Sequence, residues 1–344
     1  MKIDIEERLL HFKQPAGTSR GVYTERRVWL LTCTDEEVVG QGECAPLPQL
    51  SCDELLNYQE VLRRFCDQVE QTGIIPYDDL RDYPSMLFGL ETALLDVKGK
   101  RDKGKCLLFD NAFSRGEVGI PINGLVWMGS YEDMLNRMET KLEQGFRCIK
   151  LKIGAIDFEQ ELELVKRIRQ RFSYHEVTLR LDANGAFPFE DALYKLELLS
   201  QYNIHSIEQP IKQGQWSLMA ELCRESPLPI ALDEELIGIN DPDMKRQVLN
   251  IIRPAYIILK PSLHGGMMGT REWVDIARDM GIGSWITSAL ESNIGLNAIA
   301  QLCADIYGDH ISMAQGLGTG QLFTDNISMP LEIRGDKLWV TTNS

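Results

Sequence analysis

The sequence predicts an α/β protein: a TIM-like, modified (β/α) barrel of parallel strands that carries an N-terminal α+β capping domain. Three observations favour this fold. Strand-like segments and then helical segments fill roughly the first hundred residues, whereas short apolar runs alternate with helical segments from about residue 118. The polar residues that end these runs recur every 25 to 30 residues, the length of one βα unit. The 344-residue length suits one large domain with a smaller partner.

The capping domain is expected over residues 1–117. Strand-like apolar runs cover residues 3–12, 28–32 and 38–44, and helical spacing follows in residues 53–71 and 85–100. Two irregular segments rich in Gly and Pro, residues 13–23 and 45–50, interrupt the strands. We expect these two loops to close over the mouth of the barrel.

The barrel is expected over residues 118–320. Eight apolar runs supply its strands, at residues 120–127, 148–153, 177–182, 205–208, 229–233, 256–260, 283–288 and 311–315. Amphipathic segments between them, such as residues 158–172 and 189–201, supply the outer helices. The tail, residues 321–344, ends in a strand-like run at 337–340, and we expect this whole tail to leave the barrel and join the capping domain.

Composition and charge point to a small-molecule partner. The net charge is −15 and there is no long basic run, so we expect neither nucleic acid nor membrane as a partner. The first residues are acidic, no apolar stretch approaches about 20 residues, and the eight cysteines contain no C-x-x-C pair. We therefore expect a cytoplasmic protein with free thiols. The sequence leaves the oligomeric state open.

Three carboxylates end consecutive predicted strands: Asp182, Glu208 and Asp233. The carboxyl ends of barrel strands meet at one mouth, so these side chains are expected to converge there. Converging oxygen ligands suit Mg²⁺, for which Mn²⁺ could substitute. The alternative is that they are solvated loop acids.

Two lysines flank this group. Lys152 ends the second strand and Lys260 the sixth, so the two lie on opposite sides of an eight-strand ring. Each follows an apolar run, and we expect burial to lower both pKa values into a range useful for proton transfer. The alternative is a pair of surface lysines whose ammonium groups reach water.

Residues two positions earlier share the interior face of each strand. Lys150 is expected beside Lys152, where it could lower the pKa of Lys152 by like-charge repulsion, and Arg180 is expected beside Asp182 as a partner for a carboxylate. Structural ion pairs are an equally good interpretation of both. Ser288 ends the seventh strand, and Gly316 lies in a glycine-rich segment that is either an anion-binding loop or a tight turn.

The motifs together resemble those of the enolase superfamily, in its muconate lactonising branch. The resemblance spans nearly the whole chain and rests on these segments: Lys150-Leu151-Lys152, Leu181-Asp182-Ala183-Asn184-Gly185, Glu208-Gln209-Pro210, Asp233-Glu234-Glu235 and Lys260-Pro261-Ser262. It implies Mg²⁺-assisted removal of a proton α to a carboxylate, which gives a metal-stabilised enediolate.

Within that branch, residues 314–320, 18–21 and 42–48 look like those of the o-succinylbenzoate synthases of menaquinone biosynthesis. The resemblance implies a lyase that dehydrates 2-succinyl-6-hydroxy-2,4-cyclohexadiene-1-carboxylate. Lys152 would act as general base and then general acid, with Lys260 as a stabilising cation and Lys150 as a supporting catalytic residue. The candidate substrate-binding residues are Ser288, Gly316, Arg180 and Ser262.

Two rival functions stay open at this point. A racemase or epimerase of N-succinylamino acids, or of a related carboxylate, could use Lys152 and Lys260 as two opposed bases. The Asp-x-Asp pair that dipeptide epimerases carry near the eighth strand is missing here, which argues against a cationic dipeptide substrate. A non-catalytic metal-binding or scaffold protein would have no need for the paired lysines.

Overall fold

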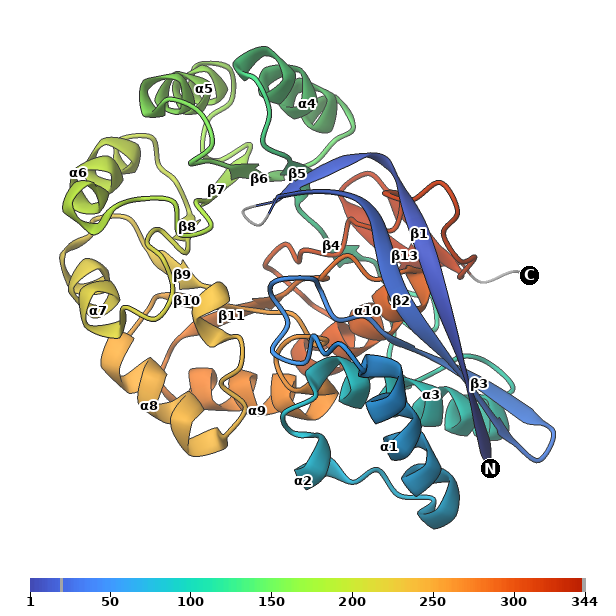
Figure 1. The fold of residues 1–344 in the computed structure, drawn as a ribbon. Helices are drawn as coiled ribbons and strands as arrows, with labels where there is room; N and C mark the ends of the chain where they lie inside the picture. Colours follow the sequence, from blue (N-terminus) through green and yellow to red (C-terminus); the bar gives the residue numbers. More distant parts are fainter. Residues whose placement is uncertain (19–20, 342–344) are drawn as a thin grey trace.

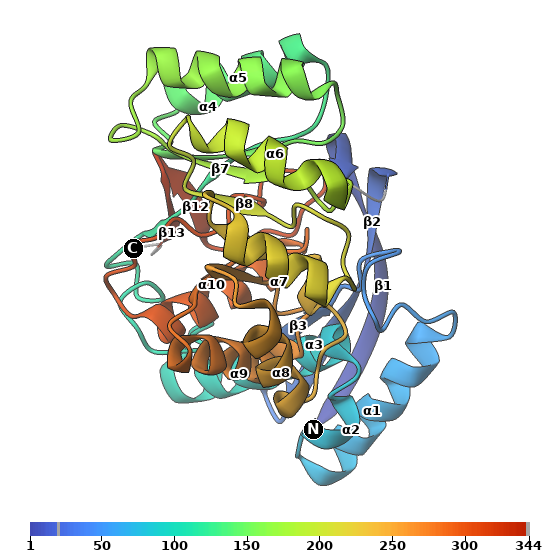
Figure 2. The ribbon, with the colours of Figure 1, turned by 90° about the vertical axis from the view of Figure 1, so that its left-hand side faces the viewer.

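The computed structural model describes residues 1–18 and 21–341. A curled parallel sheet with helices around it forms the larger part, and a three-stranded antiparallel sheet with its own helices lies across one side of it (Figures 1 and 2). The predicted fold class is therefore confirmed.

The capping sheet has the order β1-β2-β3, from β1 (Lys2–Thr18), β2 (Gly21–Asp35) and β3 (Val38–Cys44). Three helices follow, namely α1 (Tyr58–Thr72), α2 (Tyr77–Leu80) and α3 (Pro84–Lys103). Helix α3 packs closely on β3, where a Cβ on Gly42 would lie 2.1 Å from the carbonyl oxygen of Gly89. The close approach thus requires glycine at position 42.

The prediction of a loop over residues 13–23 is wrong for the residues that the structure describes there, 13–18 and 21–23. Strands β1 and β2 continue through it, with a register irregularity between His11 and Ala16, and form a long arm that reaches toward β5 and β6 (Figure 1). Pro15 lies inside this irregularity, where a missing N–H costs no ladder hydrogen bond. Gly and Pro here mark an irregular stretch of strand and not the end of one.

The large sheet has the order β11-β10-β9-β8-β7-β6-β5, with all neighbours parallel. Its strands fall within seven of the eight predicted runs: β5 (Gly124–Val126), β6 (Cys148–Lys152), β7 (Thr178–Asp182), β8 (Ser206–Glu208), β9 (Ile230–Leu232), β10 (Tyr256–Leu259) and β11 (Gly283–Ile286). The helices between and after them are α4 (Tyr131–Glu143), α5 (Phe158–Arg171), α6 (Phe189–Ser200), α7 (Trp216–Glu225), α8 (Pro242–Ile252), α9 (Gly266–Asp279) and α10 (Asn293–Tyr307).

The predicted eighth strand, residues 311–315, does not form a regular strand. The chain closes the ring through two isolated parallel bridges, Ile122 with Gln315 and Thr287 with Gly316. The Gln315 side chain takes part in this closure, because its Oε1 accepts a hydrogen bond of 2.8 Å from the backbone N–H of Ile286. A side-chain contact thus replaces part of the strand ladder.

The tail packs on the capping domain, as predicted, in its first part but not in its last two strands. Strands β12 (Leu331–Arg334) and β13 (Lys337–Val340) form a hairpin that pairs with β4 (Ile120–Pro121) in the predicted barrel segment. An earlier part of the tail does pack on the capping domain: Phe323 forms a bridge with Phe12, the N–H of Lys13 donates to the carbonyl oxygen of Leu322, and the N–H of His11 donates to Asp325 Oδ1. Among the described residues, no helix is long and apolar enough to cross a membrane.

Two buried glutamates join the capping domain to the barrel. Glu43 of β3 accepts hydrogen bonds from the N–H groups of Ser292 and Gly295 at the start of α10. Glu91 of α3 accepts them from the N–H groups of Met267 and Met268 at the start of α9. Each carboxylate satisfies amides that a helix leaves unpaired at its N-terminus, and so fixes the cap against the barrel.

Replacing Glu91 should change the pH dependence of stability. Burial raises the pKa of Glu91 to about 8 from 4.5. A carboxyl whose pKa is higher in the folded chain stabilises the fold while it is protonated, and this contribution is lost as the pH rises through about 8. The melting temperature of Glu91→Gln relative to the wild type should therefore increase between about pH 5 and pH 8 in thermal unfolding. A difference in melting temperature between Glu91→Gln and the wild type that does not change with pH would contradict this. Glu91→Ala, which loses the hydrogen bonds that cap α9, is the control.

Candidate active site

The lysines and carboxylates singled out in the sequence lie at adjacent strand ends. The register pairs Lys152 of β6 with Asp182 of β7, and Asp182 with Glu208 of β8. Asp233 and Lys260 directly follow β9 and β10. Parallel pairing in this register brings all five residues to the carboxyl end of the sheet.

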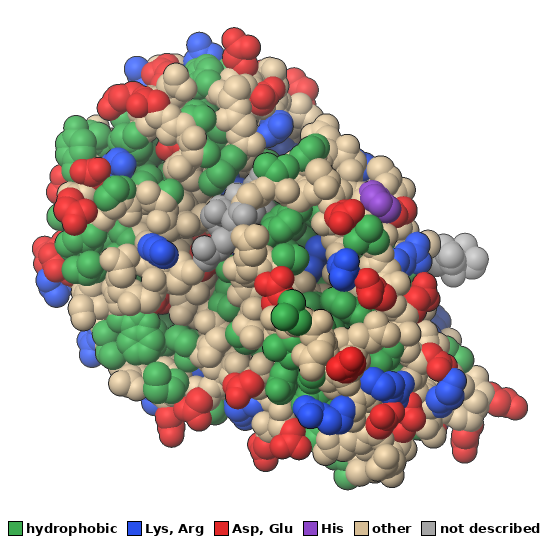
Figure 3. Space-filling model, viewed as in Figure 1, with side chains coloured by type: hydrophobic (Ala, Val, Ile, Leu, Met, Phe, Trp, Pro, Cys, Tyr) green, Lys and Arg blue, Asp and Glu red, His purple; other side chains and the backbone are tan. Residues whose placement is uncertain are grey.

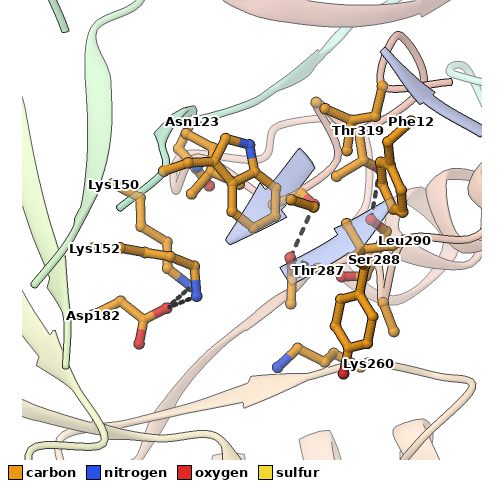
Figure 4. A pocket seen from close by; sticks show the side chains of 18 of the residues that line it. Phe12, Asn123, Lys150, Lys152, Asp182, Lys260, Thr287, Ser288, Leu290 and Thr319 are labelled. Carbon is orange, nitrogen blue, oxygen red and sulfur yellow. Dashed lines mark hydrogen bonds and ion pairs between the residues drawn. The ribbon is translucent and has the colours of Figure 1, made fainter. Parts of the chain in front are cut away.

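These side chains are joined by ion pairs. Lys150 Nζ lies 2.9 Å from Asp182 Oδ2 and 2.6 Å from Glu208 Oε2, and Lys152 Nζ lies 3.1 Å from Asp182 Oδ2. Lys260 pairs with Asp233 on the other side of the site. Figure 4 shows Lys150 and Lys152 converging on Asp182, with Lys260 across the cavity from them.

The expected lowering of the lysine pKa is wrong for Lys260. Burial alone lowers its pKa, but the nearby Asp233, Glu234 and Glu208 carboxylates outweigh burial and raise it above the ordinary value for lysine. The pKa of Lys150 is raised in the same way, by Asp182 and Glu208 against burial. The sequence showed the apolar runs around the lysines but could not show the distance to the carboxylates.

The three carboxylates fit a hard divalent cation by chemistry. Asp182, Glu208 and Asp233 are at most 2% exposed, and Oδ1 of Asp233 has no hydrogen-bond partner among the described residues. Buried carboxylates need cations, and oxygen donors are what Mg²⁺ prefers. In the described residues no three His, Cys, Asp or Glu side chains are grouped closely enough to hold a metal ion, and lysines pair with Glu208 and Asp233. The ligand roles stay predictions.

Two polar residues to which the sequence analysis gave no role form a chain of hydrogen bonds that starts at Lys152. Its Nζ donates a 2.8 Å hydrogen bond to Oδ1 of Asn184, and Asn184 Nδ2 donates one of 2.9 Å to Glu234 Oε1. Asn184 has a φ of 45°, in the left-handed region that asparagine tolerates. The sequence signal that could have identified Asn184 and Glu234 was their position, two residues after Asp182 and one residue after Asp233.

A cavity of about 530 Å³ lies over these strand ends. One wall of it is formed by Lys150, Lys152, Asp182, Asp233 and Lys260. The capping domain, the loop after β11 and the segment 316–322 lie opposite (Figure 4). The capping residues that line it come from both predicted loop segments and from Phe12 just before the first: Phe12, Lys13, Gln14, Pro15, Ala16, Tyr23, Leu47 and Leu50.

Ser288 and Gly316, both predicted to bind substrate, line the cavity. The Ser288 hydroxyl lies 2.6 Å from the Thr319 hydroxyl. A Cβ on Gly316 would lie 2.0 Å from Thr287 Oγ1, so only glycine fits there. Their binding roles stay predictions.

Arg180 and Ser262 do not line the cavity. Arg180 lies deeper in the barrel, where its guanidinium stands 4.1 Å from the centre of the Trp285 ring and Nη1 donates to the carbonyl oxygen of Ala314. Ser262 is fully buried and donates to Glu291 Oε1. Lys150, the register partner of Arg180, does reach the cavity, whereas the Trp285 ring and the Ala314 carbonyl oxygen hold the Arg180 guanidinium, so a shared face alone did not decide which side chain reaches the mouth.

A buried arginine that the sequence analysis did not single out holds the cap loop in place. Arg26 of β2 donates hydrogen bonds to the carbonyl oxygens of Ala45, Pro46 and Leu290 at 2.6, 2.5 and 3.2 Å. It therefore joins the segment 45–50 to the loop after β11, and both line the cavity.

The fold and these strand-end residues define a (β/α)-barrel enzyme of the enolase superfamily. A family model described as "Enolase C-terminal domain-like" matches residues 133–342, and one described as "MenC, N-terminal domain" matches residues 18–97. Members of this superfamily generally bind Mg²⁺.

The chain is 44% identical to an o-succinylbenzoate synthase of Desulfotalea psychrophila over 372 residues, covering 99% of both chains. The crystal structure of MenC from the same organism aligns over 99% of both chains with a TM-score of 0.81 and 40% identity. An N-succinylamino acid racemase of Thermus thermophilus is 30% identical over 81% of this chain and 75% of its own. The chain belongs to the o-succinylbenzoate synthase family.

Proposed function

We propose that the protein dehydrates 2-succinyl-6-hydroxy-2,4-cyclohexadiene-1-carboxylate to o-succinylbenzoate, the reaction of menaquinone biosynthesis. The observation that carries this proposal is the full-length 44% identity to a synthase, combined with two lysines on opposite sides of a buried carboxylate group. The product is aromatic, so its appearance in ultraviolet absorbance, when the purified protein is incubated with Mg²⁺ and this substrate, tests the proposal.

Lys152 is the proposed acid/base residue. Its ammonium group is held by Asp182 and Asn184, and it lines the cavity from the β6 side. As the free amine it would take the α-proton of the substrate, and as the ammonium it would return a proton to the departing hydroxyl. One residue can do both when the proton and the hydroxyl leave from the same face.

Lys260 is the proposed stabilising cation. Its ammonium group lies across the cavity from Lys152, beside Asp233, and from there it can face the negative charge that develops on the substrate. Lys150 holds Asp182 and Glu208 from below and is proposed as a supporting residue.

Asp182, Glu208 and Asp233 are the proposed Mg²⁺ ligands, with Mn²⁺ as a substitute. Bound there, the ion would supply positive charge for the substrate carboxylate. The lysines that now neutralise the carboxylates would then be free to face the substrate. The chain has eight free cysteines, which fits the reducing cytoplasm that we propose as its location.

Racemisation of N-succinylamino acids is a second candidate activity. The relative from Thermus thermophilus carries that name, and lysines on opposite sides of one cavity suit removal of a proton from one face and its return to the other. Incubation with N-succinyl-L-amino acids, followed by chiral chromatography, tests this activity separately from dehydration.

The cap residues over the cavity should become protected when ligand binds. Lys13 is exposed on the arm, and Phe12, Gln14 and Pro15 around it line the cavity, so bound ligand should restrict this segment. We expect saturating o-succinylbenzoate with Mg²⁺ to slow tryptic cleavage after Lys13. Mass spectrometry of the fragments measures the cleavage rate. Cleavage after the exposed Lys98 of α3 is the internal control. Equal rates at Lys13 with and without ligand would remove the role of the arm as a lid.

A further inference from the structure

The cavity extends beyond the strand ends to helix α4. There its walls include Arg137, Thr140 and Lys141, next to Leu125 and Asn123. The carboxylates that line the cavity are Asp182, Asp233 and Glu234, all at the strand-end side. The α4 side thus presents cations without an acidic neighbour in the wall.

Arg137 and Lys141 are not neutralised by the described part of the protein. Lys141 is more than half buried, yet its Nζ reaches only Gln144 Oε1 at 3.4 Å and the face of Phe146. Arg137 Nη1 donates to the backbone carbonyl oxygens of Trp127 and Met128 at 3.1 and 3.0 Å. Neither side chain has an ion pair with a described residue.

This arrangement costs stability unless an anion is supplied. The two cations stand four residues apart on one helix face, where like charges repel, and burial disfavours the charged form of Lys141. Yet the chain has 51 acidic residues against 36 basic ones, and acidic and basic side chains are interspersed over the face in Figure 3. Two neighbouring cations in a cavity wall that have no ion pair with a described residue are typical of a ligand site in such an acidic chain.

The barrel wall is incomplete between the reacting end and α4. In the described residues, no regular strand ladder joins residues 311–316 to β5; a bridge of Ile122 with Gln315 and a hydrogen bond from the N–H of Asn123 to the carbonyl oxygen of Gln315 hold them together just before β5. Residues after that bridge, Gly316, Gly318 and Thr319, line the cavity, as does Leu125 of β5. Ser288 and Thr319 thus line the same cavity as Arg137, Thr140 and Lys141 of α4.

We infer that Arg137 and Lys141 form a carboxylate-binding subsite, which takes the far carboxylate of a dicarboxylate substrate. The inference rests on the proposed function, whose substrate has one carboxylate on the reacting ring and a second at the end of the succinyl chain. The first belongs at the lysines and carboxylates of the strand ends. The second needs a cationic partner further along the cavity, and α4 supplies it.

The test compares Arg137→Gln, Lys141→Gln and the double variant with Lys98→Gln, an equal charge loss on the exposed side of α3. Removing charged hydrogen bonds should raise KM about tenfold to a hundredfold in the double variant, with kcat nearly unchanged, since the reacting end is untouched. Arg137→Lys, which keeps the charge, should restore part of the loss. Lys98→Gln should behave as the wild type, and melting curves verify that each variant is folded.

A second readout is binding of product analogues, by calorimetry. The wild type should bind o-succinylbenzoate more tightly than 2-butyrylbenzoate, in which a methyl group replaces the far carboxylate, and the double variant should lose this preference. An unchanged preference would overturn the subsite, as would a fall in kcat/KM that disappears at high salt, because that pattern indicates long-range steering alone. If the wild type does not turn the substrate over, the proposed function fails, while the binding comparison still decides the subsite.

Discussion

Lys152→Ala should abolish dehydration and also the exchange of the substrate's α-proton with solvent deuterium. Lys152 is the residue placed to take that proton, and loss of a general acid/base costs about 10²- to 10⁴-fold in rate. Exchange measured by NMR in D₂O separates loss of the base from loss of a later step. Lys166→Ala, on the exposed face of α5, is the matched control and should keep wild-type rates.

Lys260→Ala should also be slow, by about 10²- to 10³-fold or more, because a charge aimed at the developing anion is lost. Lys260→Arg keeps a cation but not its position, so we expect poor rescue. Near-normal dehydration by Lys152→Ala together with a complete loss in Lys260→Ala would reverse the assignment and make Lys260 the base. Dehydration activity in both alanine variants would show that this cavity is not the active site of the lyase.

Removal of the metal should abolish activity, and Mg²⁺ or Mn²⁺ should restore it. The reason is the buried group of Asp182, Glu208 and Asp233, whose oxygens suit a hard cation. The measurement is the initial rate after treatment with EDTA, dialysis and titration with each ion. Full turnover by the metal-free protein would contradict the proposed site.

Glu208→Gln should weaken Mg²⁺ binding in calorimetry without unfolding the barrel. The side chain lies at the strand end among the charged groups of the mouth and not among the apolar side chains between sheet and helices. A large fall in melting temperature without added metal would count against this placement.

The sequence could predict the strand ends well, because one side chain at each end must face the mouth once the strands are parallel. The 25- to 30-residue period therefore located Lys152, Asp182 and Glu208 at neighbouring positions of the register. It could not give depth or partners. Arg180 shares the face of Asp182 but stacks on Trp285 a layer below, and Asn184 contacts Lys152 through a turn that periodicity does not describe.

The parts of the fold that were predicted wrongly are held by tertiary contacts. Residues 311–315 have the composition of a strand, yet the Gln315 side chain and two bridges fix them in place of a ladder. The run at 337–340 does form a strand, but β4, more than 200 residues earlier, and not the cap is its partner. Local pattern predicts such a strand and leaves its neighbour undetermined.

The most direct test of the central claim follows the reaction in D₂O by NMR, with the wild type and Lys152→Ala given the cyclohexadiene substrate and Mg²⁺. The wild type is expected to form o-succinylbenzoate, and Lys152→Ala, shown to be folded by its melting curve, is expected neither to form it nor to exchange the α-proton. Formation of product by Lys152→Ala at a rate near that of the wild type would contradict the account.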